Sequence, residues 1–329
     1  MENIIEFPKL GLEFKISDVA FDIGGFEIKW YGIIICFGFL LSMILAMRAC
    51  EKYDISKDDL LDYLLFAMPA AIVGARLFYV IFAFDEYKDN LKEIFNIRQG
   101  GLAIYGGVIF AVITVVIVSK VKKKPVLNIL DFAAPYIILG QAIGRWGNFT
   151  NQEAFGRATN LPWGMTGNVI VERLSYYGIS RQALVHPTFL YESLACFLGF
   201  AIMMVYRNKW QKEKGEVLCL YMIIYGATRT LVETLRVDSL LAGSMKVSRL
   251  ISVGLFIIGI ALLIDIRRRV KQRIIEESSD EESSLKKIVE VIQSTDEDTL
   301  NEAEELEAAK QAELLAYELQ DNSTNSQDE

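Results

Sequence analysis

Two arginines in this sequence stand within short polar motifs that interrupt apolar stretches. Arg145 belongs to the motif Gly-Arg-Trp-Gly-Asn-Phe at positions 144–149, and Glu153 follows shortly after it. Arg229 lies in a second motif, Tyr-Gly-Ala-Thr-Arg-Thr-Leu-Val-Glu, at positions 225–233. A guanidinium group binds phosphate oxygens through two parallel hydrogen bonds and stays charged at any relevant pH. Two arginines that converge at one depth, beside glycines that allow close approach, therefore predict a phosphate-binding site.

The carboxylates near these arginines allow a second interpretation. Glu233 lies four residues after Arg229, so the two side chains share a helical face, with Arg236 on nearly the same face. The pair can simply neutralise itself as part of the structure. Arg145 has no carboxylate three or four residues before it, so this explanation does not cover it. Inside a membrane a charged side chain costs at least ~2.5–3.5 kcal/mol on insertion scales and marks a functional candidate.

Two further side chains could take part in chemistry. Tyr105 lies in the glycine-rich stretch 98–107, where it either anchors a span at the membrane interface or offers a hydroxyl to a site. His186 is the single histidine of the chain and precedes Pro187, where a helix is expected to begin. It either orients that helix or transfers a proton. A single histidine cannot form a histidine-based metal cluster, and we expect neither a metal nor a cofactor.

Long apolar runs must position these residues. The chain has 329 residues, 52% of them hydrophobic, and a bilayer core of ~30 Å requires roughly 20 apolar residues per helix. Candidate spans cover residues 30–47, 60–83, 101–119, 127–146, 189–206, 216–235 and 247–266. We therefore predict an all-α integral membrane protein with about seven transmembrane helices.

The lysines and arginines of the loops predict the orientation of these spans. One set of loops contains three dense basic clusters, at 120–124, 207–214 and 267–273, whereas the opposite loops are poorer in basic residues. Loops rich in lysine and arginine remain in the cytoplasm. The N-terminus is then outside, the C-terminus is cytoplasmic, and both arginine motifs lie near the outer ends of their spans. The phosphate available there is that of a phospholipid head group.

Three segments lie outside or around the spans. We expect an extracytoplasmic interfacial arm at 1–28, a seven-helix membrane domain at 29–270 with an extracytoplasmic loop at 147–188, and an acidic cytoplasmic tail at 271–329. From Glu276 onward the tail contains 18 acidic residues and three lysines, so the net charge of −8 conceals a basic membrane domain. The tail is expected to be disordered or partly helical, with a helix-prone stretch at 300–319. This charge distribution is not that of a nucleic-acid-binding protein.

Taken together, the motifs resemble the prolipoprotein diacylglyceryl transferase family (Lgt). The resemblance runs from Trp30-Tyr31-Gly32 at the first span to the arginine-rich end of the seventh. It includes Gly74-Ala75-Arg76 and the stretch Gly-Gly-Leu-Ala-Ile-Tyr-Gly-Gly at 100–107. The motif at 144–149 also matches, together with Glu153, Gly156 and Arg157 after it. The match continues through the motif His-Pro-Thr-Phe-Leu-Tyr-Glu at 186–192 and from Tyr225-Gly226 to Arg229 and Glu233. The acidic tail has no counterpart in the core of that family.

The resemblance implies an enzyme of the bacterial plasma membrane with its active site toward the outer leaflet. Such an enzyme moves the sn-1,2-diacylglyceryl group of phosphatidylglycerol to the thiol of the lipobox cysteine in a prolipoprotein signal peptide. A thioether forms, sn-glycerol 1-phosphate leaves, and lipoprotein maturation begins; no cofactor is needed. By resemblance Arg145 binds the phosphate and Arg229 is a second essential cation. The site is then shaped by Tyr31, Asn148, Glu153, Gly156, Glu233 and Arg236, with His186 and Arg76 in support.

Tyr105 is the main departure from the family pattern. Many members have a histidine that is regarded as important for catalysis at this position. The thiol must lose a proton before it attacks, and Tyr105, Glu153 and His186 all remain candidates to receive it. The expected role of Tyr105 is a hydrogen bond to the thiol or the phosphate.

Two other classes of membrane protein compete with the transferase. A multi-span transporter also places polar residues between spans, but it predicts paired discontinuous helices and charges near the midplane. Here the charges gather toward one face. A non-catalytic scaffold would leave the residues Arg145, Arg229 and Glu233 without a purpose.

Overall fold

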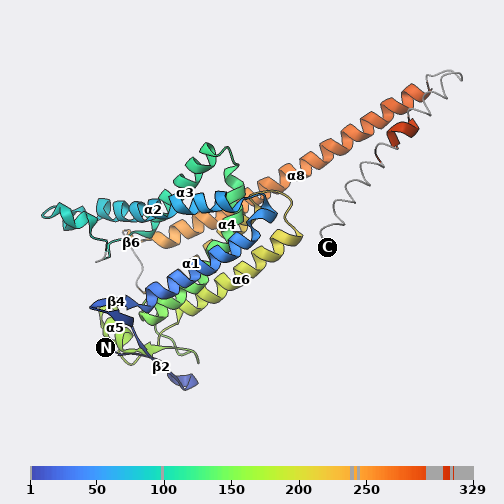
Figure 1. The fold of residues 1–329 in the computed structure, drawn as a ribbon. Coiled ribbons are helices and arrows are strands. Elements are labelled where there is room, and N and C mark those ends of the chain that lie inside the picture. The colour runs from blue at the N-terminus through green and yellow to red at the C-terminus, as the bar shows by residue number, and fades with distance from the viewer. Residues whose placement is uncertain are drawn as a thin grey trace. The chain divides into compact units, whose positions relative to one another are not determined.

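The computed structural model describes residues 2–97, 100–237, 241–242, 245–293, 307–311 and 314. Within them, seven helices are long and apolar enough to cross a membrane, which confirms the predicted number (Figure 1). They are α1 (Trp30–Ala49), α2 (Lys57–Phe82), α3 (Ile104–Val121), α4 (Val126–Thr150), α6 (Thr188–Lys209), α7 (Glu216–Leu235) and α8 (Val247–Gln293). Their bounds differ from the predicted spans by only a few residues, except that α8 continues well past 266.

Contacts between residues divide the chain into two units, 1–267 and 268–329. The first unit holds all seven spans, including the first part of α8. The second unit continues α8 to Gln293 and contains short helical pieces at 307–311 and 314. The rest of the helix-prone stretch predicted at 300–319 lies outside the described residues, as do Arg98 and Gln99.

Helix α4 is the centre of the membrane domain. Half of the residues in its most apolar stretch are buried, a larger share than in any other span of the described chain. The helix packs against α1, α6 and α7. Gly38 of α1 lies against Ile143 and Gly140 of α4, where a side chain larger than hydrogen would crowd the facing helix. The two motif residues Arg145 and Asn148 therefore lie near the C-terminal end of α4, the most enclosed span among the described residues.

Helices α2 and α3 form a second, closely packed pair. Gly74 and Gly106 face one another, and a Cβ atom on either would collide with the partner helix. Small residues at such a crossing let two membrane helices approach closely, as expected from the glycines around Tyr105. The crossing fixes the start of α3 and therefore the position of Tyr105.

The N-terminal segment and the long loop fold together into a small structure that we name the cap, residues 2–29 and 151–187. Strand β1 (Glu2–Phe7) pairs antiparallel with β2 (Leu12–Ser17) and also with β5 (Thr166–Gly167). The cap further contains the hairpin β3 (Val19–Ile23)–β4 (Phe26–Lys29), helix α5 (Asn168–Leu174), and the 3-10 turns η1 (Pro8–Leu10) and η5 (Ser175–Tyr177). The segment predicted as an interfacial arm thus forms four strands, and one of them completes a sheet with the loop.

The core of the cap explains why the two segments associate. Ile5 from β1 is fully buried against Met165, Ile170 and Val185 from the loop. The same cluster extends to Phe149 and Phe189, which belong to the ends of α4 and α6. The cap therefore joins directly to the two helices that carry the arginine motif and the 186–192 motif.

The remaining described elements are short. They are the 3-10 turns η2 (Cys50–Tyr53), η3 (Phe84–Glu86) and η4 (Leu91–Phe95), and the strands β6 (Leu241–Ala242) and β7 (Met245–Lys246), which pair with each other.

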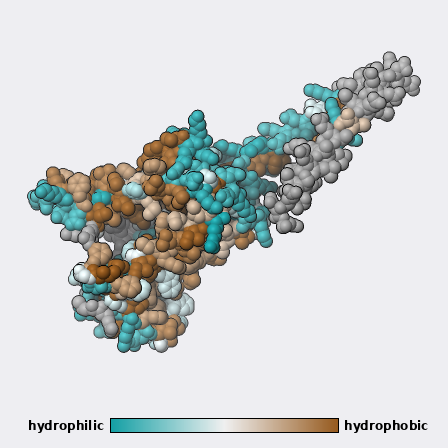
Figure 2. Space-filling view, viewed as in Figure 1, coloured by the Kyte–Doolittle hydropathy of each residue, from teal (hydrophilic) through white to brown (hydrophobic). Residues whose placement is uncertain are grey.

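The outward surface of the spans is apolar. Figure 2 shows hydrophobic residues over the helices of the membrane domain and hydrophilic residues gathered at their ends. Large apolar side chains such as Leu65, Ile81 and Leu198 are more than 60% exposed, which a soluble protein of this size would bury. This surface fits a lipid environment.

Two arginines from the predicted basic clusters turn inward. Arg207 is only 6% exposed and lies over the ring of Tyr53, with its guanidinium carbon 4.2 Å from the ring centroid. Arg267 Nε forms an ion pair with Glu216 Oε1 at 2.8 Å, and Arg267 Nη2 donates to Glu216 Oε2 at 3.1 Å. At the end opposite the cap, Arg207 thus joins α6 to η2 and Arg267 joins the first part of α8 to α7.

Candidate active site

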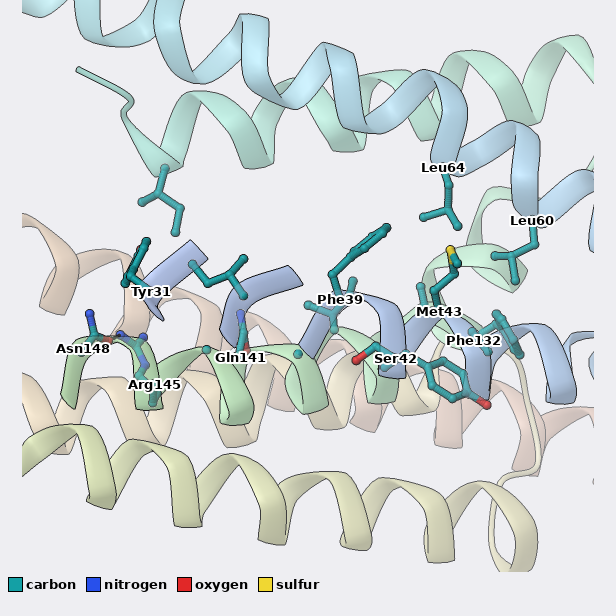
Figure 3. A pocket seen from close by; sticks show the side chains of 18 residues that line it. Tyr31, Phe39, Ser42, Met43, Leu60, Leu64, Phe132, Gln141, Arg145 and Asn148 are labelled. Atoms are coloured by element: carbon teal, nitrogen blue, oxygen red, sulfur yellow. Dashed lines mark hydrogen bonds between the residues drawn. The ribbon is translucent and has the colours of Figure 1, made fainter. Parts of the chain in front are cut away.

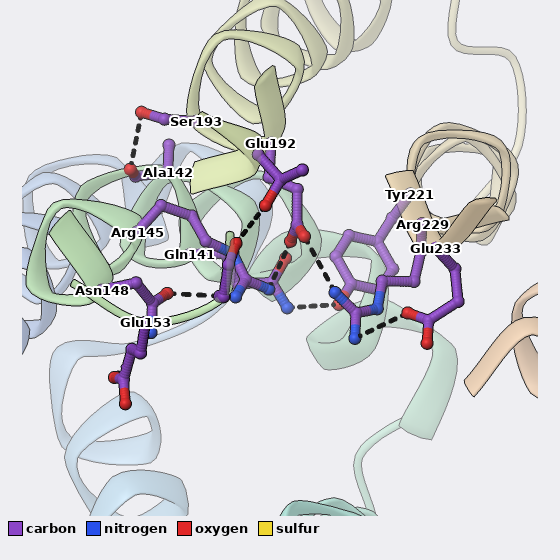
Figure 4. A network of polar contacts seen from close by, with 12 residues as sticks. Gln141, Ala142, Arg145, Asn148, Glu153, Glu192, Ser193, Tyr221, Arg229 and Glu233 are labelled. Atoms are coloured by element: carbon purple, nitrogen blue, oxygen red, sulfur yellow. Dashed lines mark hydrogen bonds and ion pairs between the residues drawn. The ribbon is translucent and has the colours of Figure 1, made fainter. Parts of the chain in front are cut away.

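A single carboxylate joins the two arginines. Arg145 Nη2 lies 2.6 Å from Glu192 Oε2, and Arg229 Nη1 lies 2.8 Å from Glu192 Oε1 (Figure 4). The three side chains come from α4, α6 and α7. The convergence of Arg145 and Arg229 expected from the sequence is therefore present, and Glu192 is the residue that produces it.

The chain of contacts continues at both ends. Arg145 Nη1 donates to Asn148 Oδ1 at 3.3 Å, and Asn148 Nδ2 donates to Glu153 Oε1 at 2.9 Å. Arg229 Nη2 lies 3.0 Å from Glu233 Oε2. We name this continuous series the relay: Glu153, Asn148, Arg145, Glu192, Arg229 and Glu233. Five of its six members were predicted site residues.

Burial makes the relay electrostatically strong. The side chains of Glu192 and Glu233 are 4% and 1% exposed, and that of Arg229 is 13% exposed. Charges removed from water interact strongly, and loss of one partner from such a pair costs about 3–5 kcal/mol. The structural pair Arg229–Glu233 exists, but it is one link of a larger network.

Local sequence explains how these groups reach one place. Asn148 is three residues after Arg145 and Glu233 is four after Arg229, so each pair shares a helical face. Glu192 lies in the second turn of α6, because that helix begins at Thr188 after Pro187.

Further contacts fasten the start of α6 to α4. Thr188 Oγ1 donates to the carbonyl oxygen of Ala154. Ser193 Oγ donates to the carbonyl oxygen of Ala142 at 2.9 Å, and Trp146 Nε1 donates to Ser193 Oγ at 3.1 Å. The turn of α6 that carries Glu192 is thus held beside the turn of α4 that carries Arg145.

An elongated apolar cavity opens beside the relay. Its volume is about 470 Å³, and it runs between α1, α2 and α4 (Figure 3). Tyr31, Arg145 and Asn148 line one end, and Leu60, Leu64 and Phe132 line the other. A cationic mouth above a long apolar interior matches the two parts of a phospholipid.

Comparison with known proteins agrees with this architecture. The family model described as prolipoprotein diacylglyceryl transferase matches residues 18–265. The chain belongs to this family.

Similar proteins in three organisms share the description phosphatidylglycerol–prolipoprotein diacylglyceryl transferase. The protein of Finegoldia magna is 47% identical over 253 residues, which cover 77% of this chain and 96% of that protein. A protein of Clostridium botulinum is 44% identical over 263 residues, covering 78% and 100%, and one of Streptococcus agalactiae is 46% identical over 255 residues, covering 77% and 97%. A transporter is not supported by these relatives. A multi-span membrane protein of this bacterial family fits the plasma membrane.

Within this diacylglyceryl transferase fold, Tyr31 lies at the Arg145 end of the cavity. Its ring packs on Gly147, where a Cβ atom would lie 2.8 Å from the ring carbon Cδ2. The glycine of the Arg-Trp-Gly-Asn motif therefore makes room for this tyrosine. Tyr31 is 37% exposed and available to a ligand.

Tyr105 lies outside the relay. Its hydroxyl donates to Ser248 Oγ of α8 at 3.0 Å, and its neighbour Ile104 lines the cavity. Tyr105 thus connects the start of α3 with the start of α8, next to the mouth of the cavity.

Arg76 has a different environment from the two relay arginines. Its guanidinium donates to the carbonyl oxygens of Ile94, Gly100 and Gly101 at 2.7, 3.0 and 2.9 Å, and also to those of Glu93 and Asn96. These bonds use its donors to hold the loop between α2 and α3. Arg76 therefore stabilises this loop and is not a member of the relay.

Gly156, Arg236 and His186 meet at the edge of the cap. Gly156 forms a β-bridge with Arg236, and a Cβ atom on Gly156 would lie 2.7 Å from Cβ of His186. His186 Nδ1 lies 3.2 Å from the hydroxyl of Tyr191, and burial lowers the pKa of the histidine below its ordinary value. These three residues hold the end of α7 against the start of α6.

Glu192 is the relay residue that sequence reasoning missed as a site residue. It was visible only as the last member of the 186–192 motif. A carboxylate inside a run that is otherwise apolar was the available signal, because such a group must find a buried partner.

Proposed function

We propose that this chain transfers the diacylglyceryl group of phosphatidylglycerol to the lipobox cysteine thiol of prolipoproteins, at the outer leaflet of the bacterial plasma membrane. The observation that carries the proposal is the pair of arginines joined by Glu192 at the mouth of an apolar cavity. Family membership supports the same reaction, since the relatives are named for both substrates.

In this proposal Arg145 holds the lipid phosphate. It belongs to both the relay and the cavity lining, so its charge faces the ligand space while Glu192 fixes its orientation. Arg229 adds a second positive charge to the same carboxylate. The acyl chains extend along the apolar walls toward Phe132.

The reaction exchanges one bond for another at the glyceryl carbon that carries the phosphate. The C–O bond to the phosphate breaks, a C–S bond to the cysteine forms, and sn-glycerol 1-phosphate leaves with the electron pair. Positive charge at the departing phosphate lowers the barrier, because it lies where negative charge accumulates. No redox partner is required.

The thiol proton needs an acceptor, since a free cysteine has a pKa near ~8.5. Of the three candidates, Glu153 is the one that belongs to the relay, and its carboxylate also accepts from Asn151 at 3.3 Å. The thiol proton then passes to the carboxylate of Glu153. Tyr105 and His186 then orient the surrounding helices through Ser248 and Tyr191.

The remaining predicted residues receive supporting roles. Tyr31 borders the head group, Asn148 connects Arg145 with Glu153, and Glu233 holds Arg229 from the other side. Gly156 and Arg236 keep the cap edge against the start of α6.

Reconstitution with defined substrates tests the function. The full chain is placed in vesicles of phosphatidylglycerol labelled in its glycerol backbone, together with a signal peptide that contains one cysteine. We expect label on the peptide in a thioether, one glycerol phosphate released per peptide, and no label on a peptide with serine instead. Label transferred equally to the serine peptide, or none to the cysteine peptide, would contradict the proposal.

A further inference from the structure

Two polar atoms without a hydrogen-bond partner among the described residues belong to side chains that line the otherwise apolar cavity. The hydroxyl oxygen of Ser42 and the side-chain oxygen Oε1 of Gln141 are both buried and have no hydrogen-bond partner among the described residues. Both residues line the cavity. A buried polar atom left unpaired costs roughly 1–3 kcal/mol, so such atoms call for a ligand.

The Ser42 hydroxyl lies beside the turn of α4 that carries Gln141. A Cβ atom on Gly140 would be 3.4 Å from Ser42 Oγ, and Gly140 is the residue before Gln141. Ser42 belongs to α1 and Gln141 to α4, the helices on which the mouth residues Tyr31 and Arg145 also stand. Figure 3 shows Gln141 and Ser42 between the Arg145 end and the Phe132 end of the cavity.

Their distance from Arg145 matches the chemistry of a glycerophospholipid. Gln141 precedes Arg145 by four residues, which is one helical turn or about 6 Å along α4 on the same face. In phosphatidylglycerol one ester group stands on the carbon next to the one that carries the phosphate, and the other stands on the following carbon. A phosphate held by Arg145 therefore brings the ester carbonyls to the part of α4 that lies beside Gln141 and Ser42.

Both side chains can donate a hydrogen bond there. The Gln141 amide nitrogen lies 3.0 Å from the hydroxyl of Tyr221. A half-turn of the amide exchanges its nitrogen and oxygen, so that Tyr221 donates to the amide oxygen and the N–H₂ group takes the place of the unpaired oxygen. The Ser42 hydroxyl turns freely to suit an acceptor.

We infer that Gln141 and Ser42 form a subsite that binds the ester carbonyl oxygens of the lipid and so selects diacyl over dialkyl glycerophospholipids. This inference rests on the proposed function and adds a specificity determinant to it. The amide and hydroxyl would position the glyceryl carbon for attack, while Arg145 holds the phosphate.

The test compares phosphatidylglycerol with its diether analogue, which has the same head group and chain length but no carbonyls. The full chain is reconstituted with each lipid, and kcat/KM for thioether formation on the cysteine peptide is measured. The wild type should prefer the diester by about five- to tenfold or more, the contribution of one or two neutral hydrogen bonds. Gln141→Leu should lose most of this preference by slowing only the diester, and Ser42→Ala should lose a smaller part.

The diether serves as an internal control for folding, since a correctly folded Gln141→Leu variant should use it as well as the wild type does. Ile137→Leu is a matched control, because Ile137 lines the cavity one turn deeper and has no polar group. Its diester preference should be unchanged. Wild-type transfer from both lipids with equal efficiency, or an equal loss for both in Gln141→Leu and Ser42→Ala, would overturn the subsite. Failure of the wild type with both lipids would instead overturn the proposed function.

Discussion

Glu192 Oε2 lies 2.6 Å from Nη2 of Arg145, although the two residues belong to different helices, α6 and α4. The other oxygen of the same carboxylate holds Arg229. One carboxylate thus neutralises the repulsion between two guanidinium groups and keeps both beside the cavity. Without it the two cations would separate, because like charges at low dielectric repel strongly.

Replacement of this carboxylate should inactivate the enzyme. Glu192→Gln keeps the shape but removes the charge, so Arg145 and Arg229 lose their common anchor, and we expect kcat/KM to fall by about 10²-fold or more. The thermal midpoint of the purified protein should also fall, since a buried pair has been broken. Glu172→Gln, at an exposed position of α5, is the matched control and should change neither quantity. Full activity of Glu192→Gln would show that the bridge is not needed.

The two arginines should act as one unit. Arg145→Lys replaces a planar fork by a point charge, and we expect about a 10²-fold loss in kcat/KM for phosphatidylglycerol, as when a pre-organised donor is removed. Arg229→Lys should have a similar effect. Because both contact Glu192, the double variant should lose much less than the product of the single losses. Strictly multiplicative losses would mean that the two cations work independently.

The hydroxyl of Tyr105 should matter through its contact with Ser248. Tyr105→Phe removes that hydrogen bond, and we expect a five- to tenfold decrease in kcat at most, about the value of one neutral hydrogen bond. Ser248→Ala should reproduce the decrease, and the double variant should be no worse. A far larger loss in Tyr105→Phe alone would assign the hydroxyl a direct part in the chemistry.

The partly buried His186 predicts an acid-sensitive cap. Burial lowers the pKa of His186 below its ordinary value of 6.5, so the unfolded chain binds the proton more readily than the folded one. The stability that neutral His186 contributes is then complete above about pH 6.5 and is lost as the pH falls below that value. The thermal midpoint of unfolding in detergent, measured between about pH 5 and about pH 7.5, should therefore depend less on pH for His186→Asn than for the wild type. Equal slopes for the two proteins would contradict the assignment.

The orientation of the chain can be read with single cysteines. Ser180→Cys lies in the cap and Lys214→Cys in the loop between α6 and α7, and both positions are exposed. If the cap is outside, an impermeant maleimide should label Ser180→Cys in intact cells, whereas Lys214→Cys should react only after the membrane is opened. The reverse pattern would place the relay at the cytoplasmic face and exclude transfer at the outer leaflet.

The sequence by itself determined the seven spans, because each is a local run of apolar residues whose length is set by the bilayer. It also pointed to Arg145, Arg229 and Glu233 as candidates, since charged groups in such runs are costly and their spacing reveals shared helical faces. The family resemblance added Asn148. The motifs were sufficient to indicate the family. These are properties of neighbouring residues along the chain.

Only the tertiary structure decided what depends on residues far apart in the sequence. The pairing of β1 with β5 merges the N-terminal arm and the long loop into one cap, and no local pattern specifies such a partner. Glu192 became the centre of the site because α6 packs on α4 beside α7. Arg76 proved to bind loop carbonyls. The unpaired atoms of Ser42 and Gln141 became recognisable only from the packing around them. A charge or an amide looks the same in a sequence whatever it faces, and its partner is chosen by packing.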